Sequence, residues 1–249
     1  MDWHKRASAA AAALALSVLA APAPAQIAAD APSSPGEAAH TLRDLVGRYL
    51  AFRGGATYEA LQSIHERLYL ETSAAQRPGA LWLDRDGRMR REAGGGGSAD
   101  VEVATAEGAW RTAADGKVVD DPGAYERSRR WALIEFGDAF TGRGGAQVAL
   151  AGSAEVGDET WSVVRITFGD ADVYDALIDP VTGGLCCYRI TEGGVQRLLK
   201  LGGWRLVDGV RMPFMQITDA GGETGSRVTA IELNRPVDAT LFQKPTGGG

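Results

Sequence analysis

Residues 203–217 read GWRLVDGVRMPFMQI, and this stretch decides the fold class of the chain. Asp208 and Gly209 supply the positive φ that a tight hairpin turn requires, so the residues on either side predict two antiparallel strands. Pro213 lacks a backbone N–H and interrupts the second strand. We therefore expect a late hairpin of a larger antiparallel sheet, and the same pattern of short strands and turn residues extends outward from it.

The segments on both sides of this hairpin predict one large sheet. Turn residues such as Gly, Asp and Pro separate the segments almost everywhere, and links this short join antiparallel neighbours. Trp161 and Val163 would face one side and Val164 the other, so both faces must be partly covered. A sheet of about ten strands must also curl. The candidate strand segments are 64–72, 79–83, 88–92, 101–104, 109–112, 147–151, 160–168, 173–178, 185–191, 195–201, 205–207, 210–218 and 227–233.

Two segments have helical periodicity instead. Between residues 37 and 53 the apolar residues form one stripe, which the following Gly-Gly pair ends. Asp121 followed by Pro122 predicts the start of an aromatic-rich helix that ends near Gly142. The predicted fold class is α+β, mainly β: a strongly curved, half-open, incomplete β-barrel of about ten antiparallel strands with helices packed in its concave face.

The N-terminus has the pattern of a secretory signal peptide. Lys5 and Arg6 precede an apolar run at 9–21, and the sequence APA at 23–25 places small residues at a cleavage site. The run is too short and too poor in large apolar side chains to span a bilayer, and no Cys lies near the cleavage site for lipid attachment. We expect residues 1–25 to be a cleaved signal peptide, 26–36 a flexible leader, 37–245 one domain and 246–249 a tail.

Composition and motifs argue against several functions. The net charge is −6 at pH 7, whereas binding to nucleic acid needs clustered Lys and Arg. No metalloprotease, nucleophile-elbow or phosphate-loop motif occurs, and His40 and His65 are interpreted as surface or satisfied residues. Asp170, Asp172 and Asp175 fit no standard cation loop and are interpreted as solvated turn residues. We therefore expect no catalytic residue, no metal and no cofactor.

The only cysteines, Cys186 and Cys187, are adjacent. Because successive strand residues point to opposite faces, an ordinary disulfide between them would require distortion. Two interpretations remain open. The pair either consists of small, partly buried strand residues, or forms a strained vicinal disulfide or redox-reactive thiol pair in an oxidising compartment.

Several stretches together resemble a known family. They are GALWL at 79–83, IDPVTGGL at 178–185, WRLVDGVRMP at 204–213, IELNRPVDATLF at 231–242 and FQKP at 242–245. With the signal peptide and the early helix, the chain from about residue 37 to 245 resembles the periplasmic outer-membrane lipoprotein-sorting (LolA-like) family. In that family a curved, incomplete β-barrel is lidded by helices, and the apolar cavity between them holds the acyl chains of lipoproteins in transit to the outer membrane.

The resemblance implies a soluble periplasmic carrier that binds the acyl chains of lipoproteins or lipids and is not an enzyme. We also expect a monomer, a loading partner at the inner membrane and no nucleic-acid partner. The alternative is a lipid- or lipoprotein-sensing regulatory module of the cell envelope. The residues expected to contact acyl chains, each of which would also serve ordinary core packing, are Trp82, Trp110, Trp131, Phe136, Phe140 and Phe214.

Overall fold

The computed structural model describes residues 27–28, 35–71, 75–94, 100–112, 116–169, 172–218 and 224–245. The predicted signal peptide and the predicted tail lie outside these ranges. The helices of the described residues are α1 (Pro35–Arg53), α2 (Ala56–Glu59) and α3 (Ala124–Glu135), with short 3-10 helices η1 (Ala139–Thr141), η2 (Arg143–Gly145) and η3 (Ala239–Phe242). Within the part of the chain that the structure describes, no helix has the length and apolar character needed to cross a membrane.

The described strands form a 14-stranded antiparallel sheet and a separate two-stranded sheet. The small sheet pairs β13 (Arg205–Val207) with β14 (Val210–Met212). In spatial order the large sheet contains β1 (Ile27–Ala28), β8 (Gln147–Val156), β9 (Glu159–Phe168), β10 (Asp172–Ile178), β11 (Leu185–Glu192), β12 (Val195–Gly202), β15 (Met215–Thr218), β16 (Thr224–Leu233), β2 (Ser63–Glu71), β3 (Gln76–Asp84), β4 (Met89–Ala93), β5 (Asp100–Thr105), β6 (Gly108–Thr112) and β7 (Val118–Asp120).

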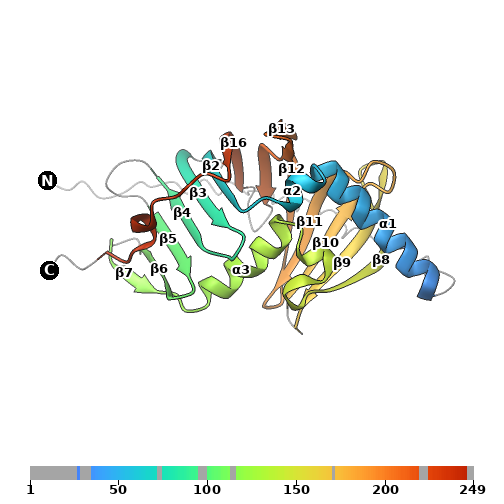
Figure 1. The fold of residues 1–249 in the computed structure, drawn as a ribbon, viewed down its shortest axis with the longest axis horizontal. Coiled ribbons are helices and arrows are strands. Elements are labelled where there is room, and N and C mark those ends of the chain that lie inside the picture. The colour runs from blue at the N-terminus through green and yellow to red at the C-terminus, as the bar shows by residue number, and fades with distance from the viewer. Residues whose placement is uncertain are drawn as a thin grey trace, which may run out of the picture.

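This strand order requires the segment after β7 to cross the sheet. Strands β2 to β7 run from the middle of the sheet to one edge, and the later strands return from the other edge until β16 pairs with β2. In a flat sheet β8 and β7, second and fourteenth in the order, would lie 12 spacings apart, which is about 58 Å. The 12 residues of α3 cover about 18 Å of this distance, and the residues that flank α3 cover the rest. The sheet is strongly curved and open, with α3 lying across it (Figure 1), which confirms the predicted fold class.

The main core lies on the face of the sheet that α1 and α3 cover, here called the inner face. The predicted stripe of α1 is confirmed, because Leu45, Val46 and Tyr49 are buried against inner-face residues of the later strands. A second cluster lies under α2, α3 and the β13–β14 hairpin. Leu50 and Trp131 pack against both clusters, so the core is continuous along the inner face.

The aromatic-rich helix is shorter than its sequence predicts. It begins at Ala124 with Gly123 at the N-cap, and no side chain caps it. The Asp121 carboxylate pairs instead with Arg127 (Oδ2–Nη2 2.7 Å). It ends at Glu135, because Gly137 has a left-handed φ of 79° that stops the helix. The residues from there to the predicted end at Gly142 form a turn and η1.

The hairpin at 203–217 is confirmed as a hairpin but not as part of the large sheet. Asp208 and Gly209 have φ values of 47° and 85°, as the turn requires. Pro213 separates β14 from β15, so the two hairpin strands form their own sheet. The hairpin packs on the end of α1, where Arg211 Nη1 donates to the Phe52 carbonyl at 2.9 Å.

Four further differences concern local structure. β7 was not predicted. β1, which lies in the predicted flexible leader, pairs with β8. Asp175 is not a solvated turn residue, because it is buried in β10, where its carboxylate accepts two hydrogen bonds from Arg165, at 2.7 and 2.9 Å. Asp172 pairs with Arg130 at 2.9 Å, and Asp170 lies outside the described residues.

A glycine substitution tests how tightly α1 packs on the β10–β11 turn. Gly183 has φ +74°, and a Cβ there would lie 2.4 Å from backbone atoms of Arg48 in α1. Gly194 has φ +81°, but nothing lies within 4 Å of its added Cβ. We expect Gly194→Ala to lower the free energy of unfolding by about 1–2 kcal/mol. Gly183→Ala should cost about 1–3 kcal/mol more, because α1 must shift. Equal losses in urea denaturation would contradict this packing.

Candidate functional site

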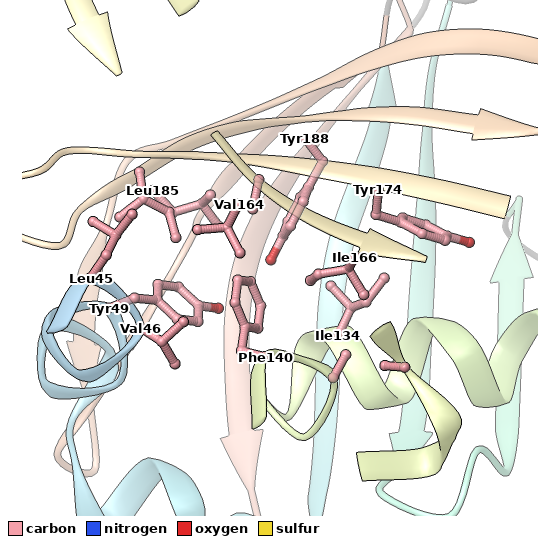
Figure 2. Packing of buried hydrophobic residues seen from close by; sticks show 14 of the residues in the cluster. Leu45, Val46, Tyr49, Ile134, Phe140, Val164, Ile166, Tyr174, Leu185 and Tyr188 are labelled. Carbon is pink, nitrogen blue, oxygen red and sulfur yellow. The ribbon is translucent and has the colours of Figure 1, made fainter. Parts of the chain in front are cut away.

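The space between the inner face, α1 and α3 is lined by apolar and aromatic side chains, and we call it the interior site. The rings of Tyr49 and Phe140 lie 4.4 Å apart between centroids, and those of Trp131 and Tyr188 meet edge to face at 6.0 Å. Figure 2 shows Tyr49 from α1, Phe140 from η1 and Tyr188 from β11 pointing toward one another. The interior site is therefore filled by aromatic rings.

Four of the six predicted contact residues lie on the inner face. Phe136 and Phe140 are buried at the end of α3 and in η1, and Trp131 is half-buried between the two core clusters. Phe214 follows the hairpin, belongs to the second cluster and also lines a surface hollow of about 460 Å³. These four residues surround one continuous apolar region.

Trp82 and Trp110 lie on the opposite, outer face. Side chains alternate along a strand, and Leu83 next to Trp82 belongs to the inner-face core. Both tryptophans pack instead with Phe242 of η3, and the His65 ring stacks on Trp82 at 4.5 Å. The structure therefore does not bring these two residues together with the other four.

Arg53, the last residue of α1, places a buried charge beside the interior site. Its side chain is 1% exposed, and its Nη2 pairs with Glu135 Oε1 of α3 at 2.8 Å. Its Nε donates to the Arg211 carbonyl and its Nη1 to the Tyr49 hydroxyl, both at 3.0 Å. The guanidinium carbon lies 4.4 Å from the centroid of the Tyr58 ring. One side chain thus joins α1, α2, α3 and the β13–β14 hairpin, and we call these five residues the arginine cluster.

A second ion pair, which does not involve α1, holds the C-terminal end of α3. Arg85, in the β3–β4 turn, donates to both carboxylate oxygens of Asp138 at 2.8 and 2.7 Å, and also to the Leu61 carbonyl at 2.8 Å. The middle of α3 is held by the Arg130–Asp172 pair at 2.9 Å. These contacts attach α3 and the turn that follows it to the β3–β4 turn and to β10, which belong to different halves of the sheet.

Glu66 is a second buried acidic group near the arginine cluster. It is 4% exposed, and its Oε2 has no hydrogen-bond partner among the described residues. Burial, followed by the nearby Glu135 carboxylate, raises the pKa of Glu66 to about 8, although Arg53 opposes the shift. Glu66 is therefore protonated at neutral pH. No group of three or more His, Cys, Asp and Glu within the described ranges is placed to hold a metal ion.

The sequence contained signals for these buried charges. Arg53 follows Tyr49 by four residues and Leu50 by three, so it continues the apolar stripe of α1. Glu66 lies between Ile64 and Leu68 in the inward-facing set of β2. A charged residue in an otherwise apolar periodic position indicates a buried charge, but its partners depend on tertiary contacts.

Substitution of Glu66 tests its protonation. The unfolded chain releases the Glu66 proton near the ordinary pKa of 4.5, whereas the folded chain holds it up to about pH 8. The free energy of unfolding should therefore fall with rising pH in this window, relative to Glu66→Gln, by up to about 1.4 kcal/mol per pH unit. Urea denaturation across the window measures the difference. Glu71→Gln, on the same strand but exposed, is the control, and parallel pH profiles for wild type and Glu66→Gln would contradict the assignment.

Comparison with known proteins supports the fold. No protein-family model and no curated protein matches the chain. Among solved structures, a LolA superfamily protein from Nitrosomonas europaea superposes with a TM-score of 0.53 at 10% identity, covering 83% of this chain and 97% of that one. A DUF1329 family protein from Desulfovibrio piger superposes with a TM-score of 0.54 at 8% identity, covering 82% and 97%. The chain has a LolA-like fold.

Proposed function

We propose that this protein is a periplasmic carrier that holds the acyl chains of lipoproteins or lipids between α1 and the inner face of the sheet. The observation that carries the proposal is a continuous apolar face, lined by aromatic rings and covered by α1, which the arginine cluster tethers at one end. The LolA-like fold and the resemblance in sequence support the same class of ligand.

The element that opens the site is α1 rather than α3. Arg85–Asp138 and Arg130–Asp172 hold α3 to the sheet on two sides. By contrast, α1 is held by polar contacts in its second half. They are the Arg48–Pro180 hydrogen bond, the hydrogen bond from Arg211 to the Phe52 carbonyl, and the contacts of Arg53 at the last turn. It also packs through its apolar stripe and the close approach of Gly183. Release of Arg53 would free the end of α1 that lies over the junction of the two core clusters.

The energy of acyl-chain burial is sufficient for this opening. A dozen buried methylene groups contribute about 10 kcal/mol. Removal of one partner from a buried ion pair costs about 3–5 kcal/mol, and this is an upper bound for separating Arg53 from the partly buried Glu135. The chain would replace the contacts among Tyr49, Phe140 and Tyr188 with contacts of similar apolar character, so most of the remaining surface stays out of water.

The proposal assigns acyl-chain contacts to Trp131, Phe136, Phe140 and Phe214. Trp82 and Trp110 remain predictions that would require a second site on the outer face. Export by residues 1–25, a monomeric state and a loading partner at the inner membrane belong to the same proposal, and the net charge of −6 argues against nucleic acid as cargo.

Lipid uptake by the purified protein tests the proposal. We expect organic extraction of protein from its native compartment to yield acylated lipid or lipoprotein, and the delipidated protein to bind a fluorescent fatty acid that unlabelled palmitate displaces. Absence of both bound lipid and displaceable binding would contradict carriage. A membrane protein that co-purifies with a lipid-free chain would favour the sensing module instead.

Removal of the buried ion pair tests the role of Arg53. Arg53→Met with Glu135→Gln removes both charges and leaves neither carboxylate nor guanidinium unpaired, so the double variant should stay folded. We expect its uptake of the fluorescent fatty acid to be at least about tenfold faster, since tenfold corresponds to only about 1.4 kcal/mol. Arg227→Met, at an exposed pair with Glu71, is the matched control. Uptake at the wild-type rate by a folded double variant would refute Arg53 as the tether.

A further inference from the structure

The adjacent cysteines occupy an irregularity in the sheet. Between β10 and β11, Leu177 pairs with Cys187 and the next residue, Ile178, pairs with Leu185. Cys186 is therefore an extra residue without a partner in β10, which is the definition of a β-bulge. The expectation that the two side chains point to opposite faces assumed a regular strand, and this strand is not regular here.

The bulge turns both cysteine side chains to the outer face. Leu185 and Tyr188 belong to the same inner-face cluster although they are three residues apart, which regular alternation does not allow. Cys186 and Cys187, between them, both pack in an outer-face cluster with Leu177. Their Sγ atoms lie 2.6 Å apart, about half an ångström more than the roughly 2.05 Å of a disulfide bond.

The two thiols differ in access and in electrostatic surroundings. Cys187 is 1% exposed, whereas Cys186 is half-buried at the surface. Lys200 lies directly opposite Cys187 on β12, and Arg189 follows it by two residues on the same face. The hydrogen bond from Cys186 lowers the pKa of Cys187, and Arg189 and Lys200 lower it further against the effect of burial. The same hydrogen bond, followed by burial, raises the pKa of Cys186.

We propose that Cys186 and Cys187 form a dithiol–disulfide site that exchanges with a disulfide donor. Exposure rather than acidity selects Cys186 for the first attack. Cys186 loses its proton to solvent, its thiolate attacks one sulfur of the donor, and the first donor thiolate leaves with a proton from solvent. The thiolate of Cys187 then attacks the Cys186 sulfur, and the second donor thiolate leaves in the same way. The pair loses two electrons and two protons, and the donor gains them as two thiols.

This site is independent of the interior site. Both sulfurs lie on the outer face, and none of the residues that hold α1 belongs to their cluster. An exported chain encounters an oxidising compartment, where disulfides form and persist. In a regular strand two adjacent cysteines point to opposite faces, whereas the bulge places both sulfurs on the same face.

Equilibration of the folded, reduced chain with oxidised glutathione tests the proposal. We expect the peptide that contains both cysteines to lose the mass of two hydrogen atoms in a chain that stays monomeric, and reduced glutathione to reverse the change. The reduced chain should bind phenylarsine oxide, which takes two neighbouring thiols and releases water. Cys186→Ser with Cys187→Ser is the control and should show neither reaction.

The single variants test the order of attack. Cys187→Ser keeps only the Cys186 thiol and should retain one glutathione as a stable mixed disulfide, because no second thiol releases it. Cys186→Ser keeps only the buried Cys187 thiol and should remain unmodified. The proposal would be overturned if both thiols remained free after equilibration of the folded chain. Reaction of the same thiols in the unfolded chain is the control that they are intact. Disulfides only between chains would overturn it as well, and a stable adduct only on Cys186→Ser would overturn Cys186 as the entry point.

Discussion

The structure depends on how one buried guanidinium is satisfied. A charge transferred from water to a protein interior is costly unless it is paired and hydrogen-bonded. Arg53 meets this requirement with a carboxylate from α3, a carbonyl from the β13–β14 hairpin and a hydroxyl from its own helix. Elements far apart in sequence must therefore come together at the end of α1. Movement of any one of them exposes the guanidinium to water or leaves it without a partner.

The topology of the sheet explains why helices cover this site. The chain builds one half of the sheet outward to β7 and the other half inward from β8, so the connection between the two edges must cross a face. In Figure 1 the sheet bends around that connection, which contains α3. Curvature encloses the apolar inner face, which would be more open in a flat sheet of the same strands. α1 covers the part of the inner face that α3 does not cover.

Much of the fold was predictable because turn chemistry is local. Asp-Gly and Gly-Gly pairs marked most strand ends, and the stripe that includes Leu45 and Tyr49 marked α1. Errors arose where distant contacts decided. Arg127 took the Asp121 carboxylate from its expected capping role, and Asp175 was buried against Arg165 from the neighbouring strand.

The candidate site was less predictable than the fold. Aromatic composition selected six residues, but the face on which each lies depends on strand alternation for two of them and on tertiary packing for the others. Strand alternation placed Trp82 and Trp110 outside, whereas Phe140 lies inside because η1 follows α3 across the inner face. The bulge at Cys186 reversed an inference that was correct for a regular strand. The charged residues Arg53 and Glu66, which occupy apolar periodic positions, are better sequence signals for the site than the aromatic residues. A charge is rarely found in an apolar stripe, whereas aromatic residues are common in any core.

The position of a bound acyl chain is the most direct measure of where this molecule binds lipid. A fatty acid with a photoreactive diazirine at the end of its chain can be bound, cross-linked and located by peptide mass spectrometry. If the chain lies under α1, cross-links form on Trp131, Phe140 or Tyr188 and disappear when palmitate competes. Cross-links confined to the outer-face hollow beside Trp110 and Phe242 would contradict an interior site between the helix and the sheet.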